Sequence, residues 1–135
     1  MDIAKLLKGI DCSCGKFHSC DIEYVSVREG AIAELCDLCK EYKEILIVAD
    51  GNTFAAAGEK TLTALEGKKI TQVIFDGDEL LIPDERAIDA VTEKLGNCDV
   101  IIGIGSGVIQ DLCKYVSLKI GLPYSTIFNI DIIKY

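Results

Sequence analysis

Apolar residues in this chain gather into short runs separated by longer segments of mixed character. The run EILIVAD at 44–50 is continuously apolar, as expected of a strand covered on both faces. Similar short, β-branched runs predict further strands at IEYVSV (22–27), KITQVIF (69–75), CDVIIGIG (98–105) and PYSTIF (123–128).

Between these runs the apolar residues recur every three or four positions, which is the periodicity of a helix with one buried face. In AIAELCDLCKEYK (31–43) the buried stripe would comprise Ile32, Leu35, Cys36, Cys39 and Tyr42. Three more helices are expected: from a cap at Asn52 or Thr53 to about Glu66, from a cap at Asp84 to Gly96, and from about Gly107 to Ile120.

Strands and helices therefore alternate along the chain. This order favours an α/β, Rossmann-like fold with a largely parallel sheet and helices on both faces. Ligands of such sheets bind beyond the carboxyl ends of the strands. We expect residues 1–21 to form a Cys/Gly-rich lead-in and residues 22–135 to form one α/β domain.

Composition narrows the classes of function. The 135 residues are half apolar, which suits one compact domain, and the formal net charge of −8 argues against a nucleic-acid partner. No apolar run reaches the roughly 18 residues of a membrane span, and the N-terminus does not resemble a signal peptide. We therefore expect a cytoplasmic protein that does not act in a membrane, and its seven cysteines are expected to be reduced thiols or metal ligands.

The segment GIGSG joins the strand at 98–105 to the following helix. Gly103, Gly105 and Gly107 let the backbone approach an anion, and the helix N-terminus adds unpaired amides and a positive dipole end. A pyrophosphate would suit this loop. The spacing is neither a Walker loop nor the usual GxGxxG fingerprint, because position 108 is valine. A purely structural turn, or a variant Rossmann site using Asp131 as its acid, remain alternatives.

From about Ile22 to Tyr124 the chain resembles the iron-containing alcohol dehydrogenase superfamily, and within it the sn-glycerol-1-phosphate dehydrogenases. The resemblance rests on ILIVADGNTFAAAG (45–58), LLIPDERAI (80–88) and DVIIGIGSGVIQDLCKYVSLKIGLPY (99–124). The last segment resembles the family pattern GxGSGxxxDxxKY followed by a GxP turn. The resemblance implies the nucleotide-binding half of a two-domain oxidoreductase, whose helical half holds a divalent zinc, nickel or iron ion. The complete enzyme would transfer hydride between NAD(P)H and dihydroxyacetone phosphate.

The same resemblance implies which residues contact NAD or NADP. The segment comprising Gly105, Ser106, Gly107, Val108, Ile109, Gln110 and Asp111 would hold the pyrophosphate. Asp50 would accept hydrogen bonds from the adenosine ribose, and its charge would favour NAD over NADP. From the residues alone, Asp50 could equally be a solvated strand end or a helix cap. Asp111, expected in the first helical turn, would mainly complement the helix dipole.

The chain also departs from the family pattern. The family continues with a motif like PTxxSxDG, where this chain has STIFNIDIIKY, with Asn129 and Lys134 in place of the Thr and the Asp. The family's metal ligands are one Asp and two His, whereas this chain has only His18. We therefore expect no catalytic residues, an absent metal-binding half, and no turnover of glycerol 1-phosphate by this chain alone. Self-association through exposed apolar surface is a further expectation. Related scaffolds oxidise glycerol or make 3-dehydroquinate, so the substrate stays open.

A second cluster of candidate ligands lies near the N-terminus. CSCGKFHSC places Cys12, Cys14, His18 and Cys20 within nine residues, and such donors suit zinc or iron. Their spacing is not a common one, so a small module that binds metal or uses its thiols is an alternative to a lead-in packed beneath the first strand. The remaining cysteines, Cys36, Cys39, Cys98 and Cys113, are expected to be buried.

Overall fold

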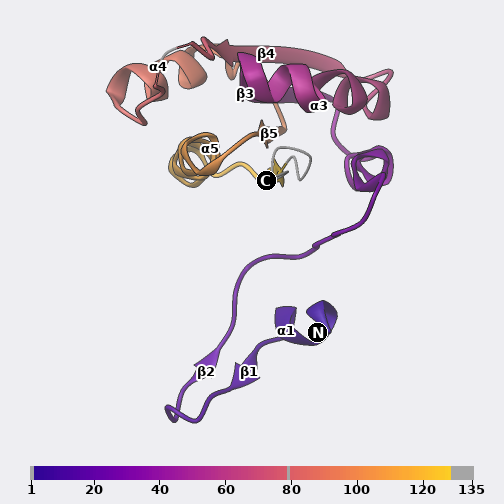
Figure 1. Ribbon diagram of the computed structural model, residues 1–135, viewed down its shortest axis with the longest axis vertical. Coiled ribbons are helices and arrows are strands. Elements are labelled where there is room, and N and C mark those ends of the chain that lie inside the picture. The colour runs from indigo at the N-terminus through magenta and orange to yellow at the C-terminus, as the bar shows by residue number, and fades with distance from the viewer. Residues whose placement is uncertain (1, 79, 129–135) are drawn as a thin grey trace. The chain divides into compact units, whose positions relative to one another are not determined.

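The computed structural model describes residues 2–78 and 80–128, and the chain divides into two compact units, Met1–Ala31 and Ile32–Tyr135. The larger unit contains a four-stranded parallel sheet in the order β4-β3-β5-β6. The strands are β3 (Glu44–Asp50), β4 (Lys69–Phe75), β5 (Val100–Ile104) and β6 (Tyr124–Ile127). They alternate with helices α3 (Gly51–Ala64), α4 (Glu85–Lys94) and α5 (Gly107–Ile120), which can be followed by colour in Figure 1. The predicted α/β fold with a parallel sheet is confirmed.

Strand β3 lies inside the sheet, paired with β4 on one side and β5 on the other. Its residues from Ile45 to Ala49 are completely buried, which explains why the run is apolar at every position rather than at alternate ones. Pairing on both sides also fixes the register. Ile47 lies opposite Gln72 of β4 and Ile102 of β5, so a slip of one residue would move apolar side chains to the wrong face.

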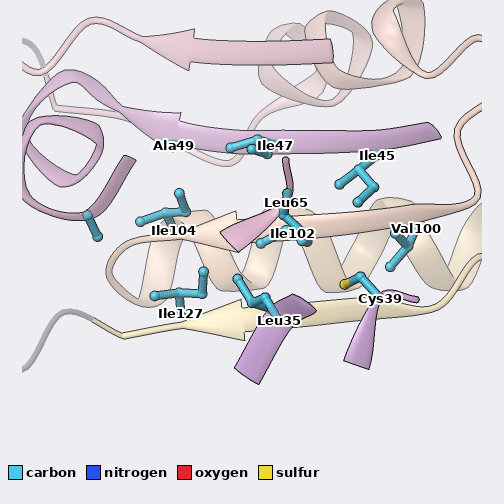
Figure 2. Packing of buried hydrophobic residues seen from close by; sticks show 11 residues of the cluster. Leu35, Cys39, Ile45, Ile47, Ala49, Leu65, Val100, Ile102, Ile104 and Ile127 are labelled. Atoms are coloured by element: carbon cyan, nitrogen blue, oxygen red, sulfur yellow. The ribbon is translucent and has the colours of Figure 1, made fainter. Parts of the chain in front are cut away.

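Alternate side chains of the strands build two separate apolar clusters, one on each face of the sheet. On the first face, β3, β5 and β6 pack against α3 and the short helix α2 (Leu35–Leu38). Figure 2 shows this cluster, in which side chains from the three strands point toward Leu35 and Cys39. On the second face, Leu46, Val48 and Ile101 pack against residues of α4 and α5. The expected helices on both faces are therefore present.

A carboxylate connects the starts of β3 and β5. Asp99 Oδ2 accepts hydrogen bonds from the amides of Lys43 (2.8 Å) and Glu44 (3.1 Å), and these backbone bonds lower the pKa of Asp99. The amide of Asp99 in turn donates to the Glu44 carbonyl at 2.7 Å. The amino ends of the two strands are thus aligned before their apolar pairing begins.

Two elements predicted from the sequence are wrong or shorter than expected. Residues 22–27 form no strand, and Ile22, Tyr24, Val25 and Val27 are exposed. β-branched residues favour a strand only where a neighbour strand and a covered face are available, and the described chain provides neither here.

The helix predicted over 31–43 is reduced to a 3₁₀ turn, Ala31–Glu34, followed by the single turn of α2. Leu35 and Cys39 are buried, whereas Cys36 is exposed, which corrects its assignment to the buried stripe. Cys36 lies next to Leu35 on a helix so short that only one narrow strip of it faces the sheet. The expected burial of Cys39, Cys98 and Cys113 is confirmed.

The smaller unit contains α1 (Ile3–Leu7) and a hairpin of two short antiparallel strands, β1 (Ile10–Asp11) and β2 (Phe17–His18). None of the described residues of this unit up to Gly30 is buried. The sequence-based domain boundary after residue 21 stays a prediction, whereas the compact units of the structure divide after Ala31. Across the described part of the chain, no helix is both long enough and apolar enough to span a bilayer.

The buried and exposed faces of the sheet lead to a stability prediction. Replacing Ile47 by Ala should lower the free energy of unfolding by about 2–5 kcal/mol, because it leaves a cavity in a fully packed cluster. The matched control is Ile74→Ala on the neighbouring strand β4, whose side chain is 40% exposed. Urea unfolding followed by circular dichroism should show a clearly smaller loss for the control. Equal losses would contradict the assigned burial.

Candidate functional site

A cavity opens at the carboxyl ends of the neighbouring strands β4, β3 and β5. It has a volume of about 160 Å³ and is lined by Asp50, Asn52, Asp76, Gly77, Leu80, Leu81, Ser106, Val108 and Ile109. The chain leaves β3 toward β4 and returns to β5 on the opposite side of β3. Such a reversal of strand order is where open parallel sheets bind their ligands, because the loops diverge and leave a crevice. The cavity is therefore the candidate site.

The loop after β5 depends on its glycines in different ways. Gly105 has φ of 154°, and a Cβ there would lie 2.9 Å from Cγ1 of Ile109. A Cβ on Gly103 would lie 2.9 Å from Cys113 Sγ, so this glycine lets α5 pack closely on β5. By contrast, a Cβ on Gly107 would meet no atom within 4 Å. Packing thus explains Gly103 and Gly105, whereas Gly107 faces open space.

Helix α5 presents its N-terminus to the cavity. Ser106 precedes the helix in an extended conformation, and its hydroxyl makes no capping hydrogen bond. The first internal bond is donated by the Gln110 amide to the Ser106 carbonyl at 3.1 Å. The amides of the first turn have no partner within a helix and lie at the positive end of its dipole. With Ser106 and Val108 lining the cavity, this end of α5 is suited to an anionic group.

Asp50 lines the same cavity and also caps helix α3. Its Oδ1 accepts a hydrogen bond from the Thr53 amide at 2.8 Å, while the Thr53 hydroxyl accepts one from the Asp50 amide at 3.1 Å. Of the alternatives left open by the sequence, the cap is therefore realised by Asp50, and Asn52 and Thr53 lie inside the helix. The cap uses one carboxylate oxygen, and Asp50 still lines the cavity. Asp50 can therefore cap α3 and line the cavity at the same time.

The side chain of Thr53 connects the two halves of the site. Its hydroxyl lies 2.8 Å from the carbonyl of Ile104, the last residue of β5, and 3.2 Å from the carbonyl of Asp50. The side chain is buried, so water does not compete for these bonds. This contact fixes the end of β3, where Asp50 lies, relative to the loop that begins with Gly105.

Two residues of the predicted pyrophosphate segment, Gln110 and Asp111, differ in their burial. Whether either residue contacts a ligand stays a prediction. Gln110 is buried, and its Nε2 donates to the carbonyls of Gly103 and Gly105, each at 3.2 Å. Gln110 therefore stabilises the loop by bonding its carbonyl groups. Its Oε1 atom has no hydrogen-bond partner in the protein. Asp111 is exposed and is the fifth residue of α5, so its expected place in the first turn is wrong. The helix begins at Gly107, which puts Asp111 one turn away from the helix terminus.

The sequence did not identify the contribution of the loop after β4. Asp76 and Gly77 follow that strand directly, and the Asn52 side-chain amide donates to the Gly77 carbonyl at 3.0 Å. A Cβ on Gly77 would lie 2.8 Å from Asn52 Nδ2. The sequence feature that marks this loop is the Asp-Gly pair directly after the strand. The pair can be assigned to the site only when β4 is known to lie beside β3.

The cavity is lined by groups of both signs of charge. Two carboxylates, from Asp50 and Asp76, line the same cavity as Ser106 and Val108 at the positive end of α5. A compact polyanion would be repelled by the carboxylates, whereas a ligand with phosphates at one end and neutral hydroxyl groups at the other would match both. The cavity thus suits a ligand that is negatively charged at one end and carries neutral hydroxyl groups at the other.

The second predicted ligand cluster is partly assembled. Cys12, Cys14 and His18 lie together in the smaller unit, with their ligand atoms all within 4.8 Å of one another, and Cys20 is not part of this group. Asn129, Asp131 and Lys134 lie outside the described residues, so the variant Rossmann acid stays a prediction.

Comparisons with known proteins find alcohol and polyol dehydrogenases by name: iron-containing alcohol dehydrogenases, glycerol-1-phosphate dehydrogenases and glycerol dehydrogenase. A sequence profile of iron-containing alcohol dehydrogenases matches residues 26–128. The glycerol-1-phosphate dehydrogenase (NAD(P)+) of Geobacillus stearothermophilus is 34% identical over 124 residues, covering 86% of this chain and 31% of the relative. The corresponding enzyme of Geobacillus thermodenitrificans is 30% identical over 123 residues, covering 84% of this chain and 30% of the relative. The chain thus spans less than a third of these relatives.

Solved structures agree on the fold. Glycerol dehydrogenase from Schizosaccharomyces pombe superimposes with a TM-score of 0.60 at 22% identity, covering 73% of this chain and 25% of the enzyme. A putative alcohol dehydrogenase from Ralstonia eutropha gives a TM-score of 0.57 at 21% identity, covering 78% of this chain and 31% of that protein. At these identities the likeness shows the Rossmann-like fold alone.

The bonds of Thr53 can be tested by an isosteric replacement. Thr53→Val should lower the free energy of unfolding by about 1–3 kcal/mol, because the partly buried amide of Asp50 and the buried carbonyl of Ile104 lose their hydroxyl partner. The control is Thr63→Val on the same helix, whose hydroxyl makes an exposed bond to the Glu59 carbonyl. Chemical denaturation of both variants checks this. A control as unstable as the Thr53 variant would refute the special role of the bond.

Proposed function

The chain belongs to the iron-containing alcohol dehydrogenase family, and from that membership we propose that it forms the NAD(P)-binding part of a glycerol-1-phosphate dehydrogenase-like oxidoreductase. In the complete enzyme, hydride would move between NAD(P)H and dihydroxyacetone phosphate. The chain would supply the cofactor site. The observation that carries this proposal is the open N-terminus of α5 at the cavity, with nothing near the Cβ position of Gly107.

The pyrophosphate would lie against the first turn of α5. Unpaired amides and the helix dipole favour its negative charge, and the Ser106 hydroxyl is free of any capping bond. The absence of a side chain at Gly107 lets the phosphate oxygens reach the backbone. Gly105 and Gln110 would keep the loop in shape without touching the ligand.

The adenosine ribose would lie toward the end of β3. There the Asp50 carboxylate can accept hydrogen bonds from two neighbouring hydroxyl groups, and its cap on Thr53 keeps it oriented. A 2′-phosphate at this position would meet a carboxylate of the same sign. We therefore propose that the site prefers NAD over NADP.

The chain's own residues bind and orient the cofactor in this proposal. When bound, the dinucleotide supplies or accepts the hydride. The donor set for the metal of related enzymes does not fit this chain, because an Asp with two His cannot be formed from a sequence with one histidine. We therefore assign no chemical step to a metal, and proton transfer to substrate is not attributed to any residue of this chain.

A change of charge at Gly107 tests the phosphate site. Gly107→Asp should weaken NADH binding by at least about tenfold, which corresponds to ~1.4 kcal/mol, because a carboxylate takes the place of the phosphate. Folding should be unharmed, since φ at this position is not positive and an acid in the first turn suits the dipole. Titration of NADH fluorescence measures the affinity.

Gly107→Asn has nearly the same size without the charge and serves as the matched control. It should bind NADH more tightly than the Asp variant, although less tightly than the unaltered chain. Equal affinities of all three proteins would contradict the placement of the pyrophosphate. Failure of the unaltered chain to show saturable binding, even at roughly millimolar NADH, would refute the proposed function.

Asp50→Asn tests the cofactor preference while keeping a good helix cap. Loss of the charge should raise NADPH affinity relative to NADH by several fold. Asp84→Asn is the control, because Asp84 caps α4 in the same way but does not line this cavity. Competition titrations with both cofactors measure the ratio. A ratio that Asp50→Asn leaves unchanged would show that this carboxylate does not set the preference.

A further inference from the structure

The hairpin of the smaller unit brings three chemically related side chains together. Strands β1 and β2 pair so that Ile10 lies opposite His18. The loop between them is closed by hydrogen bonds from the Cys12 amide to the Lys16 carbonyl (3.0 Å) and from the Gly15 amide to the Cys12 carbonyl (2.9 Å). Gly15, with φ of 80°, permits the sharp return. The loop thus positions Cys12 and Cys14 beside the histidine of the returning strand.

The distances among these side chains suit a metal ion. The Cys14 Sγ and His18 Nε2 atoms lie 3.2 Å apart, and all three ligand atoms are within 4.8 Å of one another. In a tetrahedral zinc site, bond lengths of about 2.3 Å to sulfur and 2.0–2.1 Å to nitrogen place neighbouring ligands roughly 3.5–3.8 Å apart. Small side-chain adjustments therefore suffice to surround an ion.

The backbone also orients one thiol of the group. The Cys14 amide donates a hydrogen bond to Cys12 Sγ at 3.4 Å. This bond holds the sulfur atom of Cys12 on the side of the loop where Cys14 and His18 lie.

Packing gives no other reason for this arrangement. No described residue from Asp2 to Gly30 is buried, so the hairpin has no apolar core to hold it. Units too small to bury a core are commonly stabilised by disulfides or metals, and the cysteines here are all free. A metal bound by three side chains would supply the missing stabilisation, because binding energy then becomes folding energy.

We propose that Cys12, Cys14 and His18 bind a thiophilic divalent cation of the zinc class, with a fourth position open to water. Two thiolates and an imidazole select such an ion over magnesium or calcium, which prefer oxygen ligands. Cys20 is not assigned to the site, since it lies outside the group. The site lies wholly within the smaller unit and shares no residue with the proposed dinucleotide site.

The test uses the full chain, reduced and stripped of metal with a chelator. Zn²⁺ is titrated in competition with a chromogenic chelator, and Co²⁺ serves as a spectroscopic probe of thiolate ligands. We expect one zinc ion per chain and a cobalt spectrum with sulfur-to-metal charge-transfer bands. Cys12→Ser, Cys14→Ser and His18→Ala should each weaken zinc binding by at least about tenfold, in line with the loss of a direct ligand.

Two cysteine variants are matched controls. Cys36→Ser removes an exposed thiol far along the sequence, and Cys20→Ser removes the neighbouring thiol outside the group. Both should bind zinc as tightly as the unaltered chain. The proposal is overturned if the unaltered chain does not compete for zinc, if cobalt shows no thiolate bands, or if either control loses binding as Cys12→Ser does.

A second measurement separates this site from the dinucleotide site. Circular dichroism and limited proteolysis with and without Zn²⁺ should show that the metal protects residues 2–30, and Cys12→Ser should abolish the protection. NADH affinity should not change with Zn²⁺ or with this variant. Loss of NADH binding alone would therefore count against the proposed function and leave the metal site standing. Zinc that protects the chain equally in Cys12→Ser would overturn the metal site.

Discussion

The buried hydroxyl of Thr53 is the contact on which the geometry of the candidate site depends. It bonds both the amide of Asp50, at the end of β3, and the carbonyl of Ile104, at the end of β5. Thr53 and Ile104 are 51 positions apart in the sequence. Both partners are backbone groups of strands already fixed by the sheet. The hydroxyl therefore transmits the rigidity of the sheet to the loops above it.

Close packing of α5 on β5 completes this arrangement. Because Gly103 has no side chain, Cys113 and Gln110 approach the strand directly, and Gln110 bonds the carbonyls on either side of Ile104. The N-terminus of the helix consequently begins almost at the end of the strand. A helix dipole acts over roughly its first turn, so this short connection places the favourable charge where a ligand can use it.

Much of the larger unit could be predicted from the sequence. The helix over 107–120 and the strand over 69–75 have the predicted bounds, because apolar periodicity and glycine or polar ends coincide there. The run at 22–27 has the same β-branched composition and yet forms no strand. Local composition indicates that a segment is able to form a β-strand. Whether the strand forms depends on a neighbouring strand from elsewhere in the chain.

The site shows the same limit. The positions of the glycine loop and of Asp50 were predictable, since each lies at the end of an apolar strand, but the bonds of Gln110 to the loop carbonyls were not. Its side chain turns inward because two carbonyls need a donor, and the sequence carries no sign of that demand. The contact between Asn52 and Gly77 likewise requires that β3 and β4 be neighbours, a fact that belongs to the topology.

The burial of Cys113 has a consequence for how the protein would respond to oxidants. Its thiol is enclosed beneath α5, and burial raises its pKa to about 12, so it stays protonated and out of reach of peroxide. Cys14, Cys20 and Cys36 are exposed instead. Oxidative damage would therefore start at the outer thiols, while the sulfur atoms inside the sheet layers survive as inert packing.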